Sequence, residues 1–322
     1  MADDPKPTIS MAELLKDSPM NWGKWGDDDE VGALNYLDPA QVLRGVAAVK
    51  SGKTFTLQIP VNHPGGDPVW PGRKEAQKFN VMDRGHFACN KGPHFPGALE
   101  YSDDVVLMYL QGSTQYDALG HVWYGDQLWN GYDAATTAGS MTKADVFPIA
   151  QRGVVGRGVL IDMARHRGKD VLDKGETFTH EDLLAAAEAQ GTRIEKRDIL
   201  IIRTGWIGSF YRREKEEFYK DFLEPGLTYS PELVNWFNDM EIPNLVTDTI
   251  ANEVTFDPVH GVALPLHCAL MRNLGITLTE IAELDPLADD CAADRQYTFL
   301  YTAAPLKVVG GSGAPVNPVV IK

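Results

Sequence analysis

The chain is organised around the stretch Val105-Val106-Leu107-Met108-Tyr109-Leu110-Gln111-Gly112-Ser113-Thr114-Gln115-Tyr116-Asp117-Ala118-Leu119-Gly120-His121. Its apolar first part, residues 105–110, predicts a buried strand. Side chains on a strand alternate between its two faces, so a continued strand would place Gln111, Ser113, Gln115 and Asp117 on one side. A row of polar groups at the end of a buried strand indicates a functional site, because a core position favours apolar residues.

An acid and a histidine close this stretch. His121 follows Asp117 by four residues, and the intervening Gly120 allows the chain to turn. A carboxylate and an imidazole brought together in this way can bind a metal ion or transfer a proton. The alternative is structural, with Asp117 capping a turn and His121 a hydrogen-bonded core histidine.

A second candidate pair comes from the last third of the chain. His267 precedes an apolar helix over 268–274, and Glu280 ends the short strand predicted over 276–279. A histidine at a helix start and a glutamate at the end of the next strand are plausible metal ligands from neighbouring elements. His260 is the alternative histidine for this position.

Three aromatic residues are candidates for contact with a small cyclic or aromatic substrate. Trp70 lies in a loop rich in Gly and Pro, Tyr116 lies within the polar stretch, and Trp123 follows His121. An aromatic ring on a loop can form the wall of a ligand pocket, although core packing is the other explanation. His86 and His94 lie in a further loop, from which they either reach the site or lie on the surface.

Two charged residues stand at predicted strand ends. Arg203 ends an apolar strand centred on 199–202 and either binds a carboxylate or makes a structural ion pair. Asp248 follows the short strand 244–247 and is a candidate to orient an imidazole of the site from behind. Its alternative role is to cap a turn.

The order of the predicted elements indicates an α/β protein with a mixed sheet and flanking helices. An apolar strand over 154–163 is followed by a helix over 179–190 and then by the strand at 199–203. Neither an internal repeat nor a low-complexity linker is found. The sequence therefore predicts one domain over 18–322, preceded by an N-terminal tail and short helix over 1–17.

Composition excludes several classes of partner. The 322 residues carry a net charge of −15, and no cluster of Lys and Arg predicts nucleic-acid binding. No apolar run approaches the roughly 18 residues of a membrane-spanning helix, so no membrane partner is expected. The three cysteines form no CxxC pair and the acidic N-terminal segment lacks an apolar stretch, which together favour a cytoplasmic protein.

The central stretch resembles the signature of the cyclase-like metal-dependent hydrolases, a family that includes kynurenine formamidase and isatin hydrolase. Their pattern is His-x-Gly-Thr-His-x-Asp-x-Pro-x-His, and Thr114, Asp117 and His121 match it. The departures are Gln111 and Gln115 in place of two histidines, Ser113 in place of glycine and Leu119 in place of proline. Resemblance continues in the segment 21–35, in Trp70-Pro71-Gly72 and in Arg203-Thr204-Gly205-Trp206.

This resemblance implies a swivelling β/β/α fold and a site with one divalent ion, Zn or Mn. Asp117, His267 and Glu280 would hold the ion, Gln115 or Gln111 would lend an amide oxygen, and His121 would be the general acid and base. The implied reaction is hydrolysis of a small amide, lactam, lactone or ester. Lyase, dehydratase or cyclase chemistry, or metal-free ligand binding, are the alternatives. The resemblance also implies a homodimer or homotetramer.

Overall fold

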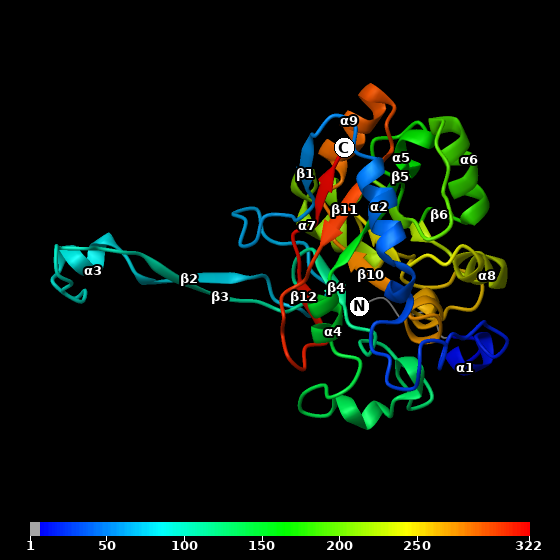
Figure 1. Ribbon diagram of the computed structural model, residues 1–322, viewed down its shortest axis with the longest axis horizontal. Coiled ribbons are helices and arrows are strands. Elements are labelled where there is room, and N and C mark those ends of the chain that lie inside the picture. Colours follow the sequence, from blue (N-terminus) through cyan, green and yellow to red (C-terminus); the bar gives the residue numbers. More distant parts are fainter. Residues whose placement is uncertain (1–6) are drawn as a thin grey trace.

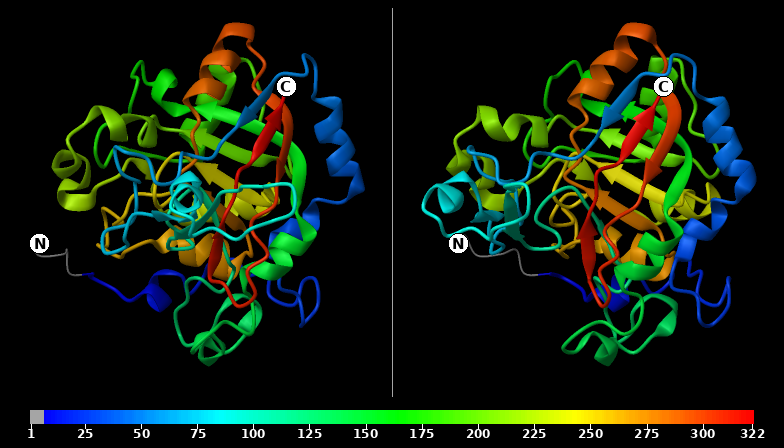
Figure 2. Two further views of the ribbon diagram at one scale, coloured as in Figure 1. Left: turned by 90° about the vertical axis from the view of Figure 1, so that its left-hand side faces the viewer. Right: turned by 60° about the vertical axis from the view of Figure 1, so that its left-hand side comes forward.

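One curled, mixed sheet of nine strands forms the centre of the computed structural model, which describes residues 7–322 (Figure 2). The first six residues of the predicted N-terminal tail lie outside the described residues. The strands, in their order across the sheet, are β1 (Thr54–Thr56), β13 (Val319–Ile321), β11 (Thr298–Ala303), β5 (Val154–Asp162), β7 (Ile199–Arg203), β9 (Asn244–Thr247), β10 (Thr277–Glu280), β4 (Gln115–Asp117) and β12 (Gly313–Pro315).

The middle of the sheet is parallel and its two sides are antiparallel. β5, β7, β9 and β10 run parallel to one another. All pairs on either side of them are antiparallel: those that join β5, β11, β13 and β1, and those that join β10, β4 and β12. Every residue of β7, β9 and β10 is buried, as expected for parallel strands that are covered on both faces. The predicted α/β fold with a mixed sheet is confirmed.

Nine α-helices, five 3-10 helices and one π-helix connect the strands in the described residues. The α-helices are α1 (Met11–Leu14), α2 (Pro39–Ala47), α3 (Arg84–Ala88), α4 (Val146–Arg152), α5 (Met163–His166), α6 (His180–Gln190), α7 (Lys215–Tyr219), α8 (Pro231–Asp239) and α9 (Asp285–Asp294). The 3-10 helices are η1 (Gly32–Tyr36), η2 (Trp129–Gly131), η3 (Ala134–Thr137), η4 (Ile207–Arg212) and η5 (Lys220–Phe222), and the π-helix is η6 (His267–Asn273). No helix in residues 7–322 is long and apolar enough to cross a membrane.

Local sequence signals explain where the longer helices begin and end. The Asp38 side chain accepts hydrogen bonds from the first turn of α2, and Pro39 at the first position already has the helical φ. A capping box of Thr179 and Asp182 starts α6, which stops at Gly191 in the left-handed conformation. α2 packs against β5 and β11, and α6 packs against β5 and α5 (Figure 1).

A two-stranded hairpin projects far from this body (Figure 1). Its strands β2 (Gln77–Met82) and β3 (Asp103–Leu107) pair antiparallel, and α3 lies near its tip. We call residues 77–107 the arm. Its apolar residues are exposed; Phe79, for example, is 51% exposed and Leu107 is 67% exposed. Two further short strands, β6 (Thr177–Phe178) and β8 (Gly226–Leu227), pair parallel elsewhere.

The structure corrects the prediction of a buried strand over 105–110 that could continue to Asp117. Every residue of β3 is exposed, and the chain breaks at 108–114 before it enters the sheet as β4. The apolar run therefore does not belong to the core of this chain. Because the strand is interrupted, side-chain alternation does not extend from Gln111 to Asp117.

Candidate metal centre

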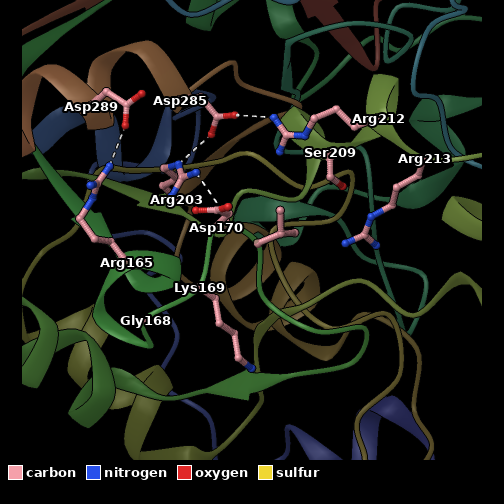
Figure 3. A pocket seen from close by; sticks show the side chains of 11 residues that line it. Arg165, Gly168, Lys169, Asp170, Arg203, Ser209, Arg212, Arg213, Asp285 and Asp289 are labelled. Atoms are coloured by element: carbon pink, nitrogen blue, oxygen red, sulfur yellow. Dashed lines mark hydrogen bonds and ion pairs between the residues drawn. The ribbon is translucent and has the colours of Figure 1, made fainter.

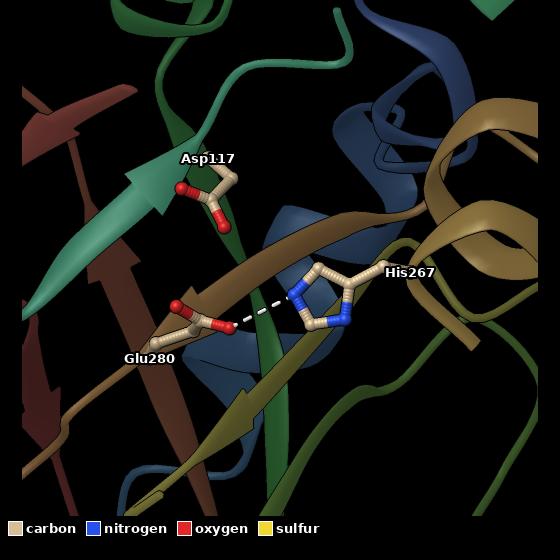
Figure 4. A group of neighbouring side chains, drawn as sticks. All are labelled: Asp117, His267 and Glu280. Atoms are coloured by element: carbon tan, nitrogen blue, oxygen red, sulfur yellow. Dashed lines mark hydrogen bonds and ion pairs between the residues drawn. The ribbon is translucent and has the colours of Figure 1, made fainter. Parts of the chain in front are cut away.

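Asp117, His267 and Glu280 lie together, and one ligand atom from each lies within 4.8 Å of the others (Figure 4). Asp117 is the last residue of β4 and Glu280 the last of β10, the strand beside it. His267 is the first residue of η6, which leads towards β10. All three side chains are buried.

The register of β4 decides which of its side chains reach this centre. Gln115 is paired with Glu280 across the two strands, and Asp117, two residues on, points to the same face. Tyr116 points to the other face, where its hydroxyl bonds to Asn244 Oδ1 and Tyr301 Oη at 3.0 Å each. Tyr116 is fully buried there and offers no surface to a substrate.

Two amide side chains hold the carboxylate of Glu280. Gln115 Nε2 donates to Oε2 at 2.7 Å, and Asn252 Nδ2 donates to Oε1 at 3.0 Å. A carboxylate only accepts hydrogen bonds, so both amides must turn their nitrogen towards it. The carbonyl oxygens of Gln115 and Asn252 consequently face elsewhere, and neither has a hydrogen-bond donor in the described residues.

His267 lies between two glutamates. Its Nδ1 lies 2.7 Å from Glu253 Oε1, and its Nε2 lies 3.2 Å from Glu280 Oε1. Burial alone would lower the pKa of this imidazole, but the hydrogen bonds and charges of Glu253 and Glu280 outweigh burial and raise the pKa to about 10. Without a metal, His267 is therefore a cation that neutralises part of the buried negative charge.

Asp117 has no comparable partner. Its Oδ1 lacks a hydrogen-bond donor among the described residues, and the nearest cationic candidate is His121 Nε2 at 4.0 Å. Burial raises the pKa of Asp117 to about 6, and the charge of Glu280 adds to that rise while His121 opposes it. Burial lowers the pKa of His121, which favours a neutral imidazole at neutral pH.

Buried oxygen atoms without a hydrogen-bond donor indicate whether a metal ion fits this centre. A buried oxygen without a donor is costly, and three of them lie in this region: Asp117 Oδ1, Gln115 Oε1 and Asn252 Oδ1. Two belong to side chains that already bond to Glu280. A divalent cation held by Asp117, His267 and Glu280 would satisfy the oxygen of Asp117, while the two amides keep the Glu280 carboxylate in place. The donor set of this centre therefore fits a divalent ion.

A family model described as "Putative cyclase" matches residues 55–254, which is more than half of the chain. The chain belongs to the cyclase family. A solved structure described as a novel cyclase is 36% identical, with a TM-score of 0.86, and the match covers 94% of this chain and 100% of that one.

Two more distant structures share the fold. Isatin hydrolase A from Labrenzia aggregata, bound to benzyl benzoate, is 20% identical with a TM-score of 0.59, covering 87% of this chain and 97% of its own. A predicted metal-dependent hydrolase from Bacillus stearothermophilus is 16% identical with a TM-score of 0.50, covering 83% and 97%. No curated protein sequence matches the chain.

Several residues that the sequence singled out lie outside the centre. The amide of Gln111 donates to Ser312 Oγ at 2.9 Å, because the break before β4 turns it away from Asp117. His260 pairs with Asp257 instead, with its Nδ1 2.8 Å from Oδ2. His86 caps α3 on the arm, and His94 is exposed on the same arm.

Asp248 differs from its expected role. Its carboxylate accepts hydrogen bonds from Thr204 N, Thr204 Oγ1 and Gly205 N, at 2.7 to 2.8 Å, and so fixes the turn after β7. The residue that orients the imidazole is Glu253, which also accepts the backbone N–H of His267 at 2.7 Å. This correction follows from position, since Asp248 follows β9 directly whereas Glu253 lies further along the loop, beside η6.

The proposed aromatic wall is only partly assembled. Trp70 is half-buried and packs edge-on against Phe222, with 4.6 Å between ring centroids. Asp67 holds the loop that carries Trp70 in place. Its buried carboxylate accepts hydrogen bonds from the backbone N–H groups of Asn62, His63 and Ala76. Trp123 is 44% exposed on the loop after His121.

Sequence reasoning missed Asn252, Glu253 and Glu224. Asn252 and Glu253 lie in the loop after β9, next to β10 in the sheet, and parallel strands bring the residues after their carboxyl ends to one edge. That rule could have found the first two. Glu224 is buried with an unpartnered Oε1, and burial followed by the charge of Glu280 raises its pKa to about 8. It is therefore a neutral acid near the centre at neutral pH.

Metal affinity is expected to rise with pH. The ion must replace the proton on Nε2 of His267, whose pKa of about 10 means that binding releases about one proton at neutral pH. The dissociation constant for Mn²⁺ should then fall about ten-fold per pH unit above pH 6, and more steeply below it, where Asp117 is also protonated. Titration calorimetry at pH 6.5, 7.5 and 8.5, in buffers of different protonation enthalpy, measures both the dissociation constant and the number of protons released. An affinity independent of pH would contradict this protonation state.

Proposed function

We propose that this cyclase-family chain is a metal-dependent hydrolase that opens a small cyclic or aromatic amide, lactam, lactone or ester. The observation that carries the proposal is the buried group of Asp117, His267 and Glu280, with unpartnered amide oxygens from Gln115 and Asn252 beside it. The two structural neighbours described as isatin hydrolase and metal-dependent hydrolase support the same reaction class.

Asp117, His267 and Glu280 would hold one divalent ion. Bound there, the ion would lower the pKa of a water molecule and polarise a substrate carbonyl. A neutral amide is a weaker zinc ligand than an imidazole, and the amides of Gln115 and Asn252 bond to Glu280 through their nitrogen atoms. The ligand group therefore consists of two carboxylates and one imidazole. We therefore expect manganese or zinc, with the oxygen-rich set shifting the preference from zinc towards manganese or magnesium.

His121 is proposed as the general acid and base. Its Nε2 lies 4.0 Å from Asp117 Oδ1, and its side chain retains 22% exposure, so it faces both the centre and the solvent side. With its pKa lowered by burial, the imidazole is neutral and accepts a proton from attacking water, then returns it to the leaving group. Trp70 and Trp123 are proposed to bound the substrate as flat walls.

The first test is the metal content of protein purified without chelator or His-tag, measured by elemental analysis. About one equivalent per chain is expected, together with turnover in a screen of lactones, lactams and aryl amides that includes isatin. Protein that binds no metal even after soaking would overturn the proposal and favour a metal-free ligand-binding protein.

His121→Ala is expected to lower kcat by about 100- to 10,000-fold, because a positioned general base contributes that much. Its metal content should stay unchanged, since His121 is not part of the ligand group. His260→Ala is the matched control and should retain full turnover. Loss of metal in His121→Ala would contradict a purely proton-transferring role.

Lyase, dehydratase or cyclase chemistry is the alternative on the same residues, with His121 removing a carbon-bound proton. Reaction in ¹⁸O-labelled water separates the classes. A hydrolase places the label in the new carboxylate, whereas a lyase yields an unlabelled product with a new double bond.

We also propose that a second copy of the chain covers the arm. An isolated two-stranded hairpin is only marginally stable in water, and the arm exposes apolar side chains that a partner would bury. Residues 84–99 at its tip contain two cations, two histidines and no carboxylate, whereas the whole chain carries −15. This charge pattern is complementary to the body of another copy.

Phe79→Asp with Leu107→Asp is expected to convert a dimer or tetramer into a monomer, because two charges would enter the covered surface. Val46→Asp with Leu43→Asp on α2 is the matched control, since those residues have the same exposed fractions, 51% and 67%. Light scattering after size-exclusion chromatography measures the mass. A wild-type protein that is monomeric at all concentrations would refute the assembly.

A further inference from the structure

A second cavity lies outside the metal centre, beyond the carboxyl ends of β5 and β7 (Figure 3). Its volume is about 750 Å³. Ligands of parallel sheets commonly bind outside the carboxyl ends of the strands. The lining residues are Arg165, Gly168, Lys169, Asp170, Val171, Arg203, Ser209, Arg212, Arg213, Asp285 and Asp289.

The charge of the cavity lining is opposite in sign to the net charge of the protein. It contains five cationic and three acidic side chains, in a chain with a net charge of −15. An acidic protein repels anions unless local cations offset its field. The cavity is therefore a place where this protein attracts an anion.

Most of the cations in this cavity are already paired. Arg203 is buried and donates to Asp285 Oδ1, Asp162 Oδ1 and the carbonyl of Asp170, at 2.8 to 3.0 Å, so it makes a structural ion pair. Arg165 pairs with Asp162 and Asp289, and Lys169 pairs with Asp173 and Glu176. These residues build the rigid base of the cavity.

Arg212 and Arg213 have weaker contacts with acidic residues than the other cations of the cavity. The nearest carboxylate to Arg212 is Asp285 Oδ2 at 4.0 Å, and Asp285 already accepts from Arg203. Arg213 forms no ion pair with any residue in 7–322, and its guanidinium lies over the ring of Trp206 at 4.9 Å. Figure 3 shows both guanidinium groups on one side of the cavity. Arg213 thus lacks an anionic partner in residues 7–322, and Arg212 has only the long ion pair with Asp285, which it shares with Arg203.

We propose that this cavity binds a phosphate group through Arg212 and Arg213. A guanidinium presents parallel N–H donors that match two oxygens of a phosphate, and two such groups favour a dianion over a monoanion. The volume exceeds the needs of inorganic phosphate and accommodates the organic part of a small phosphomonoester. Phosphate as a free ion and phosphate within a small metabolite share this chemistry.

The fluorescence of Trp206 can report phosphate binding directly. It is fully buried and lies beneath Arg213, so movement of this guanidinium towards an anion should change the fluorescence of its indole. The change should be absent in Trp206→Phe, which removes only this indole among the seven tryptophans.

The test titrates inorganic phosphate, and then phenyl phosphate, at constant ionic strength, with calorimetry and tryptophan fluorescence as readouts. Saturable binding of about one phosphate per chain is expected, with phenyl phosphate binding more tightly if the natural ligand is a phosphomonoester. Arg212→Gln with Arg213→Gln should weaken binding at least ten-fold. Arg84→Gln, an exposed arginine on the arm, is the control and should bind as the wild type does.

Three outcomes would overturn the proposal. The first is the absence of saturable binding at millimolar phosphate, and the second is binding that the double substitution leaves unchanged. The third is binding that disappears when a chelator removes the metal, since that would place phosphate at the metal centre. Arg212 is 59% exposed, so Arg212→Gln alone should fold normally and still weaken binding if the double variant is unstable.

Discussion

Replacing His267 by alanine is expected to abolish metal binding and to destabilise the protein by about 3–5 kcal/mol. The imidazolium is the cation between the buried carboxylates of Glu253 and Glu280, and removing one partner of a buried ion pair leaves uncompensated charge. Turnover should be lost with the metal. Urea unfolding measures the stability loss, and elemental analysis measures the metal.

His260→Ala is the control for this substitution. His260 also pairs with a buried carboxylate, Asp257, but it is 33% exposed and lies outside the ligand group. It should retain the metal and lose less than about 1 kcal/mol, as expected for a partly solvated pair. If His267→Ala were as stable as the wild type, the two glutamates would have to be uncharged in the folded protein.

Replacing Asp117 by asparagine should also remove the metal, but with the opposite effect on the metal-free fold. The folded-state pKa of about 6 lies above the unfolded value of 3.8, so ionisation of Asp117 costs folding stability as the pH rises through this window. Asparagine avoids that cost. The metal-free variant should therefore be more stable than the metal-free wild type above pH 6, by roughly 2–3 kcal/mol, and the difference should vanish near pH 4.

Asp248→Asn separates this effect from the general removal of a buried charge. Burial raises the pKa of Asp248 to about 6 as well, yet both oxygens of Asp248 accept hydrogen bonds. The amide nitrogen of asparagine would replace one of these oxygens and could not accept the N–H group that faces it. Asp248→Asn should keep the metal and lose stability, whereas Asp117→Asn should do the reverse. Thermal melts of chelator-treated protein between pH 4 and 8 give the comparison. Equal behaviour of the two variants would argue against an unpartnered Asp117.

The sequence predicted the elements whose signals are local. The helix predicted over 179–190 is α6 in the structure, and the apolar strand predicted at 199–203 lies in the middle of the sheet as β7. The α/β order therefore emerged from local sequence patterns alone. The prediction of a core strand at 105–110 was wrong. An apolar run indicates burial of any kind, including burial that only a partner could provide.

The sequence could predict those residues of the site whose chemistry is evident from the residue type and its position alone. Asp117, His267 and Glu280 lie together, as their residue types and positions at element ends had indicated. Gln111 and Asp248 lie elsewhere, because a break in a strand and the length of a loop are decided by packing that spacing does not show. Asn252 and Glu253 were missed because their roles depend on partners met only in the folded chain.

The strand order also sets when the site can form during synthesis. β4, which carries Gln115 and Asp117, is paired on its outer edge by β12, and the partner on its inner edge is β10. A ribosome adds about 5–20 residues per second, so β12 is made roughly 200 residues, or on the order of 10–40 s, after β4. The nascent chain thus holds Asp117 without its sheet neighbours for this interval. We expect the metal to be acquired only after β10 and β12 have been made and paired with β4.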